Sequence, residues 1–214
     1  MSPGALRDCP RLLTIEGGEG AGKSTVLEAL RDELAGRGFE VVCTREPGGT
    51  PLAEMIRALL LDPSHEPPSP QAELLLMFAS RAQHVRETVL PALERGAWVV
   101  SDRFTDSSYA YQGGGRGLDP EFIAELERRV VGIRPGLTLL LDVPVAEGRA
   151  RANGRERASD RIERERDEFF ERARAVFLAR AEAEPARFRV IDARRDADTV
   201  AAEARALLRD HLAR

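Results

Sequence analysis

The chain contains one lysine, Lys23, within a glycine-rich segment whose residue types and spacing can bind phosphate. Residues 17–24 read G-G-E-G-A-G-K-S and match the pattern G-x-x-x-x-G-K-[ST]. In such a loop the backbone N–H groups converge on the phosphates of a nucleoside triphosphate, the lysine neutralises the β/γ oxygens, and the next hydroxyl ligates Mg²⁺. Lysine and arginine together number 32, and all but Lys23 are arginine, which fits a position where a compact ammonium suits phosphate better than a planar guanidinium. The expected triphosphate-binding residues are Gly17, Gly18, Glu19, Gly20, Ala21, Gly22, Lys23, Ser24 and Thr25.

Charged side chains follow several strand-like segments and could hold a second anion or a metal. Arg45 and Arg103 follow the second and third of these segments, and a guanidinium can bind phosphate through two parallel hydrogen bonds. Asp102 ends an apolar run, where an unpaired carboxylate would be costly to bury, so we expect a Mg²⁺ or arginine partner for it. Asp142, after three leucines, is an alternative Mg²⁺ ligand. We prefer Asp102, together with the Ser24 hydroxyl, as the metal site.

The phosphate-binding segment lies between a short apolar strand and a helical pattern, and this alternation continues along the chain. Five strand-like segments cover residues 12–16, 40–44, 97–102, 137–142 and 188–192. Helical patterns cover residues 24–37, 53–61, 71–95, 119–131, 145–152, 162–184 and 197–213. This order predicts an α/β fold of the P-loop NTPase type, with a five-stranded parallel sheet flanked by helices. Ligands of such sheets gather beyond the carboxyl ends of the strands, where the charged residues are found.

Composition limits the classes of protein that fit. A chain of 214 residues with 43% hydrophobic residues suffices for one domain, which we place at residues 12–214 after an N-terminal extension at residues 1–11. A formal charge of -4 argues against nucleic acid as the main partner. No run approaches the roughly 18 apolar residues of a membrane span, and residues 1–11 lack the apolar segment of a secretory signal. We therefore expect a cytoplasmic protein with small-molecule partners and no membrane association.

The lysine count also narrows the choice of nucleotide. Guanine-reading GTPases use an N-K-x-D segment, which needs a second lysine that this chain lacks. ATP-dependent chemistry is therefore expected, and the arginines beside the strand ends indicate an anionic second substrate.

Several further motifs together resemble those of one family, the bacterial thymidylate kinases. In chain order they are E-G-x-E-G-A-G-K-S at 16–24, T-R-E-P-G-G-T at 44–50, F-A-S-R at 78–81, D-R-F at 102–104 and A-Y-Q-G-G-G-R-G at 110–117. Other nucleoside monophosphate kinases share the phosphate loop but not T-R-E-P-G-G-T or the tyrosine-containing glycine run. The resemblance, which spans residues 12–192, implies transfer of the ATP γ-phosphoryl group to thymidine 5′-monophosphate (dTMP). It further implies that Mg²⁺ is the cofactor, that the reaction serves dTTP biosynthesis and that the protein is a homodimer.

The resemblance also implies roles for individual residues. In the family, the positions of Arg45 and Arg103 hold the acceptor phosphate or bridge it to the donor, and the position of Asp102 helps to organise the metal and the phosphates. The other implied roles belong to Phe78, which stacks on thymine, Arg81, which hydrogen-bonds the base, Ser108, which contacts the base, Tyr111, which packs under the deoxyribose, and Glu19, which receives the 3′-hydroxyl. Gln112, before three glycines that would permit a tight turn, is a further nucleotide contact. From the residues alone, Phe78 and Arg81 would be a core phenylalanine beside a surface arginine.

An arginine-rich segment at residues 149–166 is expected to form a mobile lid. It contains seven arginines around a central Asn-Gly that interrupts the helical pattern. Family members without an arginine in the phosphate loop, where this chain has Gly20, carry the catalytic arginine in the lid. The candidates are Arg161, Arg155 and Arg157, and Arg149 is expected to lie against the adenine. A solvated arginine-rich helix is the alternative.

The expected reaction needs neutralisation of charge rather than a general base. The second pKa of a monophosphate is about 6, so the attacking oxygen is ionised at neutral pH. The expected catalytic residues are Lys23, Arg45, Asp102, Arg103 and a lid arginine, acting with Mg²⁺. The alternatives are a kinase of another nucleoside monophosphate or of a deoxynucleoside, and a nucleotide-binding regulator that has lost catalysis.

Overall fold

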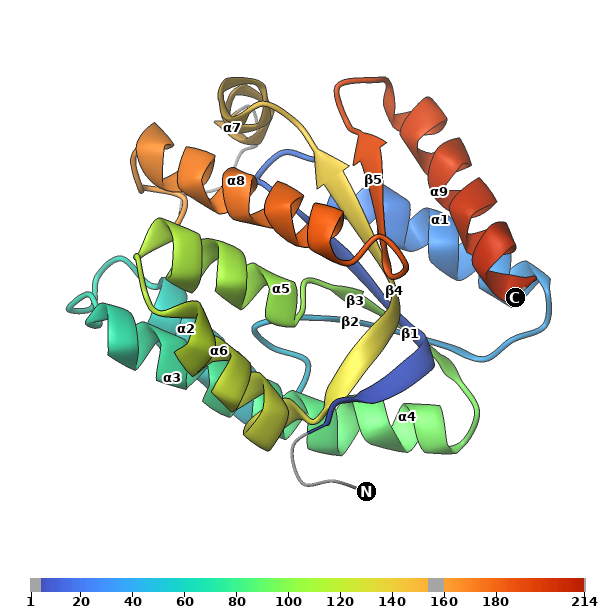
Figure 1. Ribbon diagram of the computed structural model, residues 1–214, viewed down its shortest axis with the longest axis horizontal. Coiled ribbons are helices and arrows are strands. Elements are labelled where there is room, and N and C mark those ends of the chain that lie inside the picture. The colour runs from blue at the N-terminus through green and yellow to red at the C-terminus, as the bar shows by residue number, and fades with distance from the viewer. Residues whose placement is uncertain (1–4, 154–159, 214) are drawn as a thin grey trace.

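A parallel sheet forms the centre of the molecule, with helices on both sides (Figure 1). The computed structural model describes residues 5–153 and 160–213. The strands in these residues are β1 (Arg7–Gly17), β2 (Val41–Arg45), β3 (Trp98–Asp102), β4 (Ile133–Asp142) and β5 (Phe188–Asp192). They lie in the order β2-β3-β1-β4-β5, and every neighbouring pair is parallel. The predicted five-stranded parallel sheet flanked by helices is thereby confirmed.

The register of the strands brings three chain segments to one edge of the sheet. Asp102, the last residue of β3, is in register with Arg45 of β2 on one side and Ile15 of β1 on the other. β1 continues to Gly17, where the phosphate loop starts. Because parallel strands end at the same edge, the loops after β1, β2 and β3 meet there.

Helices cover both faces of the sheet. They are, in chain order, α1 (Lys23–Gly36), α2 (Pro51–Leu61), α3 (Pro70–His84), α4 (Leu90–Glu94), α5 (Thr105–Ser108), α6 (Pro120–Leu126), α7 (Val145–Asn153), α8 (Asp167–Ala183) and α9 (Ala197–Leu212). The π-helical stretches η1 (Val85–Val89), η2 (Tyr109–Gly115) and η3 (Glu127–Val131) continue α3, α5 and α6. Within the described part of the chain, no helix is both long enough and apolar enough to cross a membrane.

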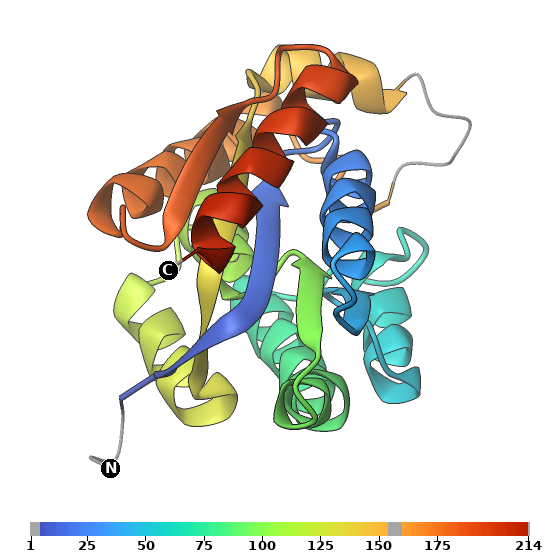
Figure 2. The same cartoon turned by 90° about the vertical axis from the view of Figure 1, so that its right-hand side faces the viewer.

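The side chains of β1 alternate between the two layers of helices. Leu13 and Ile15 belong to the core formed with α1 and α9, which lie side by side in Figure 2. Leu12 belongs to the core formed with α3 and α6 on the other face. Successive strand residues point to opposite faces, so a strand covered on both sides is apolar throughout. This explains why the strands are visible in the sequence as short continuous apolar runs.

Residues 7–11, expected to belong to an N-terminal extension, form the start of β1. Arg7 pairs with Ile133 and Cys9 with Pro135, before a shift in register between Cys9 and Leu13. The side chains of this part are mostly polar and exposed, with Cys9 buried. Because these first residues of β1 are not a continuous apolar run, the hydrophobic pattern places the start of the strand at residue 12 instead of Arg7. Similarly, the helix expected from residue 162 begins at Asp167 as α8.

Residues 105–115 are helical, although their three consecutive glycines would also permit a tight turn. A side chain at Gly115 would collide with the ring of Phe169, and a Cβ at Gly114 would lie 2.7 Å from Cγ2 of Val176. Both of these neighbours belong to α8. The glycines therefore allow η2 to pack closely against α8.

Candidate active site

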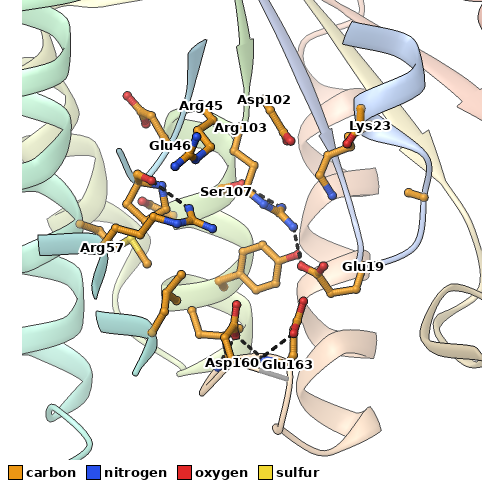
Figure 3. Close-up of a pocket in the computed structure, with 18 of the residues that line it drawn as sticks. Glu19, Lys23, Arg45, Glu46, Arg57, Asp102, Arg103, Ser107, Asp160 and Glu163 are labelled. Atoms are coloured by element: carbon orange, nitrogen blue, oxygen red, sulfur yellow. Dashed lines mark hydrogen bonds and ion pairs between the residues drawn. The ribbon is translucent and has the colours of Figure 1, made fainter. Parts of the chain in front are cut away.

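A cavity of about 540 Å³ opens at the carboxyl edge of the sheet, between the loops that follow β1, β2 and β3 (Figure 3). Glu19 and Lys23 of the phosphate loop lie on one side of it, and Glu46 and Arg57 lie on the other. Arg103 lies between these two sides. The site therefore has two ends joined by an arginine.

The phosphate loop and α1 place Lys23 and Ser24 at the cavity. Gly22, with a φ of 90°, forms the N-cap of α1 in a conformation that favours glycine. The Nζ of Lys23 donates hydrogen bonds to the carbonyl oxygens of Gly17 at 3.2 Å and Gly18 at 2.8 Å. Burial lowers the pKa of the Lys23 ammonium. The ammonium is thus held by hydrogen bonds to the phosphate loop, next to the expected position of the phosphates.

Two glycines bring α7 against the phosphate loop. A side chain at Gly20 would collide with the carbonyl of Gly148, and one at Gly148 would collide with the carbonyl of Glu19. No arginine side chain fits at residue 20 in this arrangement. Ala21 is buried and lines the cavity, whereas Thr25 is exposed on the first turn of α1 and is not part of the cavity wall.

Asp102, rather than Asp142, presents a carboxylate suited to a metal. Asp102 lines the cavity, and its Oδ1 is buried without a hydrogen-bond partner among the described residues. Asp142 accepts hydrogen bonds from Nε and Nη2 of Arg174 at 2.7 and 2.9 Å. Within residues 5–153 and 160–213, no three His, Cys, Asp or Glu side chains form a metal site. Asp102 and Ser24 fit Mg²⁺ that takes its remaining oxygen ligands from phosphate and water.

Arg103 crosses the cavity from the end of β3 to the phosphate loop. Its Nη1 donates to the carbonyl of Gly17 at 3.0 Å, and its Nη2 donates to Oε1 of Glu19 at 2.7 Å. Arg45 lines the cavity from β2, with its Nη2 within 3.0 Å of both carboxylate oxygens of Glu54 on α2. Arg57 of α2, which the sequence did not indicate, also lines the cavity and donates from Nη1 to a backbone carbonyl.

Arg81 is fixed at the other end of the cavity by three acceptors. It is 3% exposed, and its Nε donates to Oε2 of Glu46 at 2.6 Å. Its Nη1 donates to Oγ of Ser108 at 3.0 Å and its Nη2 to the carbonyl of Phe104 at 3.1 Å. The structure thus brings together Arg81 and Ser108, which the sequence predicted as contacts of one base.

Phe78 occupies a different place from the one expected. Its ring is 2% exposed and lies 4.7 Å from the Cζ of Arg81. The adjacent residue Met77, not Phe78, is part of the cavity wall. In this conformation Phe78 supports the guanidinium from the core side.

Glu46 also joins His84 to this end of the site. Its Oε1 lies 2.8 Å from Nδ1 of His84, whose Nε2 lies 2.7 Å from Oγ1 of Thr44. Burial raises the pKa of Glu46, but the charge of Arg81 and the hydrogen bonds from His84 and Arg81 outweigh it and hold that pKa below its ordinary value. Glu46 is therefore an ionised anchor for Arg81 at neutral pH.

Tyr111 and Gln112 come from η2. The Tyr111 ring lies 4.9 Å from the Cζ of Arg103, and its hydroxyl is buried with no hydrogen-bond partner in the described residues. Burial raises the pKa of this hydroxyl, so it stays protonated. Gln112 lines the cavity and donates from Nε2 to Oε1 of Glu73 at 2.9 Å. Tyr111 and Gln112 therefore both form part of the cavity wall.

Comparison with known proteins agrees with this geometry. The sequence model of the thymidylate kinase family matches residues 15–204. The chain belongs to the thymidylate kinase family. Among its relatives, the thymidylate kinase of Chromohalobacter salexigens is 56% identical over 100% of this chain and 99% of its own. That of Alkalilimnicola ehrlichii is 59% identical over 86% and 85% of the two chains. The crystal structure of thymidylate kinase from Ehrlichia chaffeensis has a TM-score of 0.75 and 32% identity, covering 95% of this chain and 99% of that one.

The arginines that the family resemblance placed in a lid are only partly within the described residues. Arg155 and Arg157 lie outside them. Arg161 donates from Nε to the carbonyl of Leu60 at 2.8 Å and from Nη2 to Oε2 of Glu73 at 2.7 Å. In this conformation Arg161 thus binds α2 and α3 and does not reach the phosphate loop.

Arg149, expected to lie against adenine, is next to the outer side of the phosphate loop. It shares a small pocket with Gly17 and Gly18. Its Cζ lies 4.8 Å from the ring centre of Phe170, and its Nη1 donates to the carbonyl of Glu165 at 2.7 Å. An arginine stacked on an aromatic ring in this way offers a flat surface beside the loop.

Sequence reasoning missed two buried acidic residues of the site. Glu46 lies inside the T-R-E-P-G-G-T motif, in which Arg45 was the predicted phosphate contact. Glu73 is an isolated acidic residue in the apolar helix α3, and it accepts hydrogen bonds from Gln112, Arg116 and Arg161. A lone carboxylate in an apolar helical segment was the available signal, because a buried charge needs partners.

Proposed function

We propose that the protein is an ATP-dependent thymidylate kinase that transfers the γ-phosphoryl group of ATP to dTMP, forming dTDP and ADP. The observation that carries this proposal is a single cavity with the Lys23 loop on one side, the buried Arg81–Ser108 pair on the other and Arg103 between them. Such a cavity suits a monophosphate nucleotide whose phosphate faces the triphosphate held by the Lys23 loop.

The donor end has the groups that a triphosphate requires. The loop amides and Lys23 suit the phosphates of ATP, and Ser24 and Asp102 suit Mg²⁺. When bound with ATP, Mg²⁺ supplies positive charge that offsets the charge of the phosphates. Lys23 would have to leave the carbonyl oxygens of Gly17 and Gly18 to bind phosphate.

The acceptor end is expected to position dTMP without removing a proton. Arg45 and Arg103 would hold the monophosphate, whose attacking oxygen is ionised at neutral pH because its second pKa is about 6. Arg81 and Ser108 would read the base, and Glu19 would receive the 3′-hydroxyl. Catalysis would then consist of positioning the two substrates and stabilising charge.

Turnover of a set of acceptors tests this assignment. Purified protein would be supplied with Mg-ATP and, separately, with dTMP, dUMP, dCMP or thymidine, and ADP formation would be measured. We expect dTMP to react fastest and thymidine, which lacks the phosphate, not to react. Lys23→Met should lower kcat by about 100- to 1,000-fold. Faster turnover of another monophosphate would reassign the substrate, and tight ATP binding without ADP formation would indicate a regulator.

We also propose that the protein is a homodimer that uses the outer face of α2. Leu52, Met55 and Leu59 recur at a spacing of three or four residues and are 45%, 65% and 48% exposed. This spacing places them in one stripe on the helix. Leu75 on the neighbouring α3 is 50% exposed as well. Apolar side chains gathered in this way are typical of an interface between protein chains.

Sedimentation of a charged variant tests the dimer. Met55→Asp should shift the protein toward the monomer at micromolar concentration, while Val190→Asp, which changes an exposed valine on β5, should leave the assembly unchanged. A monomeric wild type, or a Met55→Asp protein that remains dimeric, would contradict the proposed interface.

A further inference from the structure

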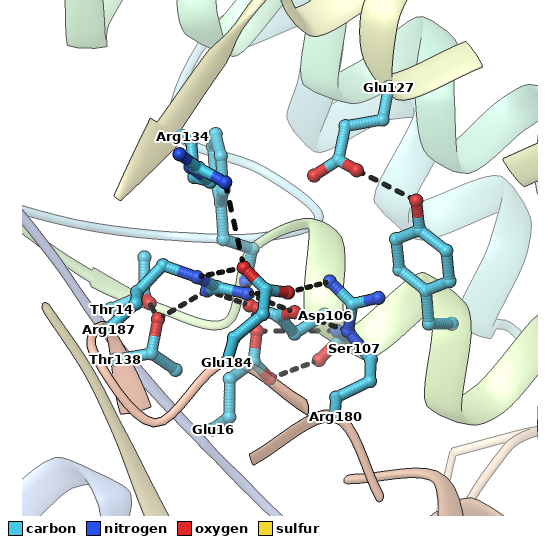
Figure 4. A network of polar contacts seen from close by, with 12 residues as sticks. Thr14, Glu16, Asp106, Ser107, Glu127, Arg134, Thr138, Arg180, Glu184 and Arg187 are labelled. Atoms are coloured by element: carbon cyan, nitrogen blue, oxygen red, sulfur yellow. Dashed lines mark hydrogen bonds and ion pairs between the residues drawn. The ribbon is translucent and has the colours of Figure 1, made fainter. Parts of the chain in front are cut away.

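A fully buried carboxylate lies directly behind the phosphate loop and takes no direct part in the proposed binding of either substrate. Glu16, the residue before Gly17 in β1, is 0% exposed. Its Oε1 accepts hydrogen bonds from the backbone N–H groups of Phe104 at 2.8 Å and Ser107 at 3.3 Å. Its Oε2 accepts from the Ser107 hydroxyl at 2.6 Å (Figure 4). All of these donors belong to the segment that follows Asp102.

This segment contains the strained residue of the site. Arg103 has a φ of 71°, and no other non-glycine residue in the described part of the chain has a positive φ. A side chain in this region of backbone conformation is unfavourable and persists only where its surroundings enforce it. The enforcing contacts are the Arg103 N–H to the carbonyl of Ile15 at 2.9 Å and the Ser101 hydroxyl to the carbonyl of Arg103 at 2.7 Å. The next amide, that of Phe104, is the one bound by Glu16.

A second connection runs through a side chain. The Ser107 hydroxyl donates its proton to Glu16 and accepts a hydrogen bond from Nη1 of Arg103 at 3.3 Å. The same Nη1 also donates to the carbonyl of Gly17. A hydroxyl has one proton, and the Ser107 proton is donated to Glu16. The lone pairs of the Ser107 oxygen are therefore left to accept the hydrogen bond from Arg103.

We propose that Glu16 is a positioning residue that holds Arg103 in the geometry needed to bridge the two phosphates, acting through the Phe104 amide and the Ser107 hydroxyl. The inference rests on the proposed function, because it assumes that Arg103 contacts the phosphates. The Glu16 side chain is not part of the cavity wall, and among the described residues its carboxylate accepts hydrogen bonds from the segment that aims Arg103.

The segment has a separate anchor, so loss of the Glu16 contacts need not unfold it. Asp106, also 0% exposed, accepts from Nε of Arg180 and Nη1 of Arg187, each at 2.7 Å (Figure 4). Arg187 further donates to Oγ1 of Thr138 at 2.7 Å. These contacts tie α5 to α8, β4 and the segment before β5, independently of Glu16.

The ionised form of Glu16 fits its three donors, since each of them needs an acceptor. The charged and titratable groups facing it are Asp106 of α5, Arg103 after β3, Lys23 of α1 and Tyr111 of η2. Burial, and next the neighbouring Asp106 carboxylate, raise the pKa of Glu16 to about 7, against the opposing charge of Arg103. The positioning contacts should therefore weaken as the pH falls through neutrality.

Kinetics of two variants and a matched control test the proposal. Glu16→Gln keeps the shape of the side chain and removes its charge, and Ser107→Ala removes the hydroxyl that contacts Arg103. Thr14→Val is the control, because Thr14 lies two residues away on β1 and its hydroxyl pairs with that of Thr138 rather than with the segment after Asp102. We expect both test variants to lower kcat by roughly 10- to 100-fold, with ATP affinity within about 3-fold of wild type, and the control to keep the wild-type kcat.

The pH profile separates positioning from a merely structural role. Wild-type kcat should fall on the acid side in two steps, one near the second pKa of dTMP at about 6 and one from Glu16. Glu16→Gln should retain only the first. An unchanged kcat and profile in Glu16→Gln, or a loss in melting temperature without a loss in kcat, would overturn the proposal.

A crystal structure of Ser107→Ala gives a test that does not depend on the substrate. We expect the Arg103 guanidinium to leave Gly17 and Glu19, and an unmoved guanidinium would refute the connection through Ser107. If the wild-type protein does not phosphorylate dTMP, the proposed function is wrong. The structural comparison of Ser107→Ala with wild type still shows whether Glu16 and Ser107 position Arg103.

Discussion

Glu46 and Arg81 form an ion pair in which both side chains are almost fully buried, with 2.6 Å between Oε2 and Nε. The pair connects the loop after β2 with α3, so two segments 35 positions apart in the sequence define one end of the cavity. The remaining guanidinium nitrogens are directed to Ser108 and to a backbone carbonyl. Glu46 therefore fixes the orientation of the Arg81 guanidinium at this end of the cavity.

Removing the charge of Glu46 should weaken dTMP binding selectively. In Glu46→Gln, Arg81 loses a charged partner, and we expect the KM for dTMP to rise about 10-fold, equivalent to one charged hydrogen bond, with the KM for ATP unchanged. Arg81→Ala should damage dTMP recognition more strongly. Steady-state kinetics with each substrate varied in turn measures both effects. Glu33→Gln, which breaks a surface pair with Arg37, is the control, and equal losses for ATP and dTMP would contradict a role in reading the base.

The two candidate metal aspartates can be separated by one substitution each. Asp102→Asn should lower kcat by about 100-fold and raise the Mg²⁺ concentration needed for half-maximal activity, because it removes a ligand charge at the phosphates. Asp142→Asn should cost about 1 kcal/mol of stability by weakening the Arg174 pair, without altering the Mg²⁺ requirement. Rate measurements across a Mg²⁺ titration, with urea unfolding of each variant, test both expectations. The reverse pattern would make Asp142 the ligand.

Glu73 should prove important for both stability and substrate binding. It is 0% exposed and pairs with Arg116 and Arg161 while it orients Gln112. Glu73→Ala should cost about 3 kcal/mol, since it removes the buried carboxylate that Arg116 and Arg161 share, and Glu73→Gln should raise the KM for dTMP. The comparison is Glu165→Gln, whose side chain binds Nη1 of Arg116 but not Gln112, and it should have a small effect. A KM that responds equally to both glutamine variants would exclude a specific link from Glu73 to Gln112.

The two buried carboxylates at the site should give opposite pH dependences of stability. Glu16 has a pKa raised from the ordinary 4.5 to about 7, so between these values the folded chain binds more protons than the unfolded chain. Wild type should therefore lose stability relative to Glu16→Gln as the pH rises from 4.5 to about 7. Glu46 has a lowered pKa, so its contribution is present above 4.5 and is lost as the pH falls below that value.

Unfolding by urea at several pH values between about 4 and 8 measures these differences. The free energy of unfolding of Glu16→Gln minus that of wild type should increase as the pH rises toward 8. The amount by which Glu46→Gln is less stable than wild type should decrease as the pH falls toward 4. If the difference in unfolding free energy between Glu16→Gln and wild type does not change with pH, burial does not shift the pKa of Glu16 in the folded protein.

The sequence predicted the sheet well, because strands buried on both faces are continuous apolar runs, but it predicted the polar contacts within the site poorly. The start of β1 at Arg7 escaped detection, since polar exposed residues can pair as well as apolar ones. The partners of Glu46 and Glu73 lie far away in the chain, so only the folded structure brings them together. A helical apolar pattern also cannot distinguish Phe78 in the core from Met77 at the cavity.

A chain with a single lysine has a built-in site for chemical labelling. Reagents that acylate amines can modify only one side chain of this protein, and that side chain is tied to two carbonyl oxygens of the phosphate loop. A protease that cleaves only after lysine likewise has one target, the peptide bond between Lys23 and Ser24. The speed of either reaction, followed by mass spectrometry, would report how often the loop opens and how far a bound nucleotide keeps it closed.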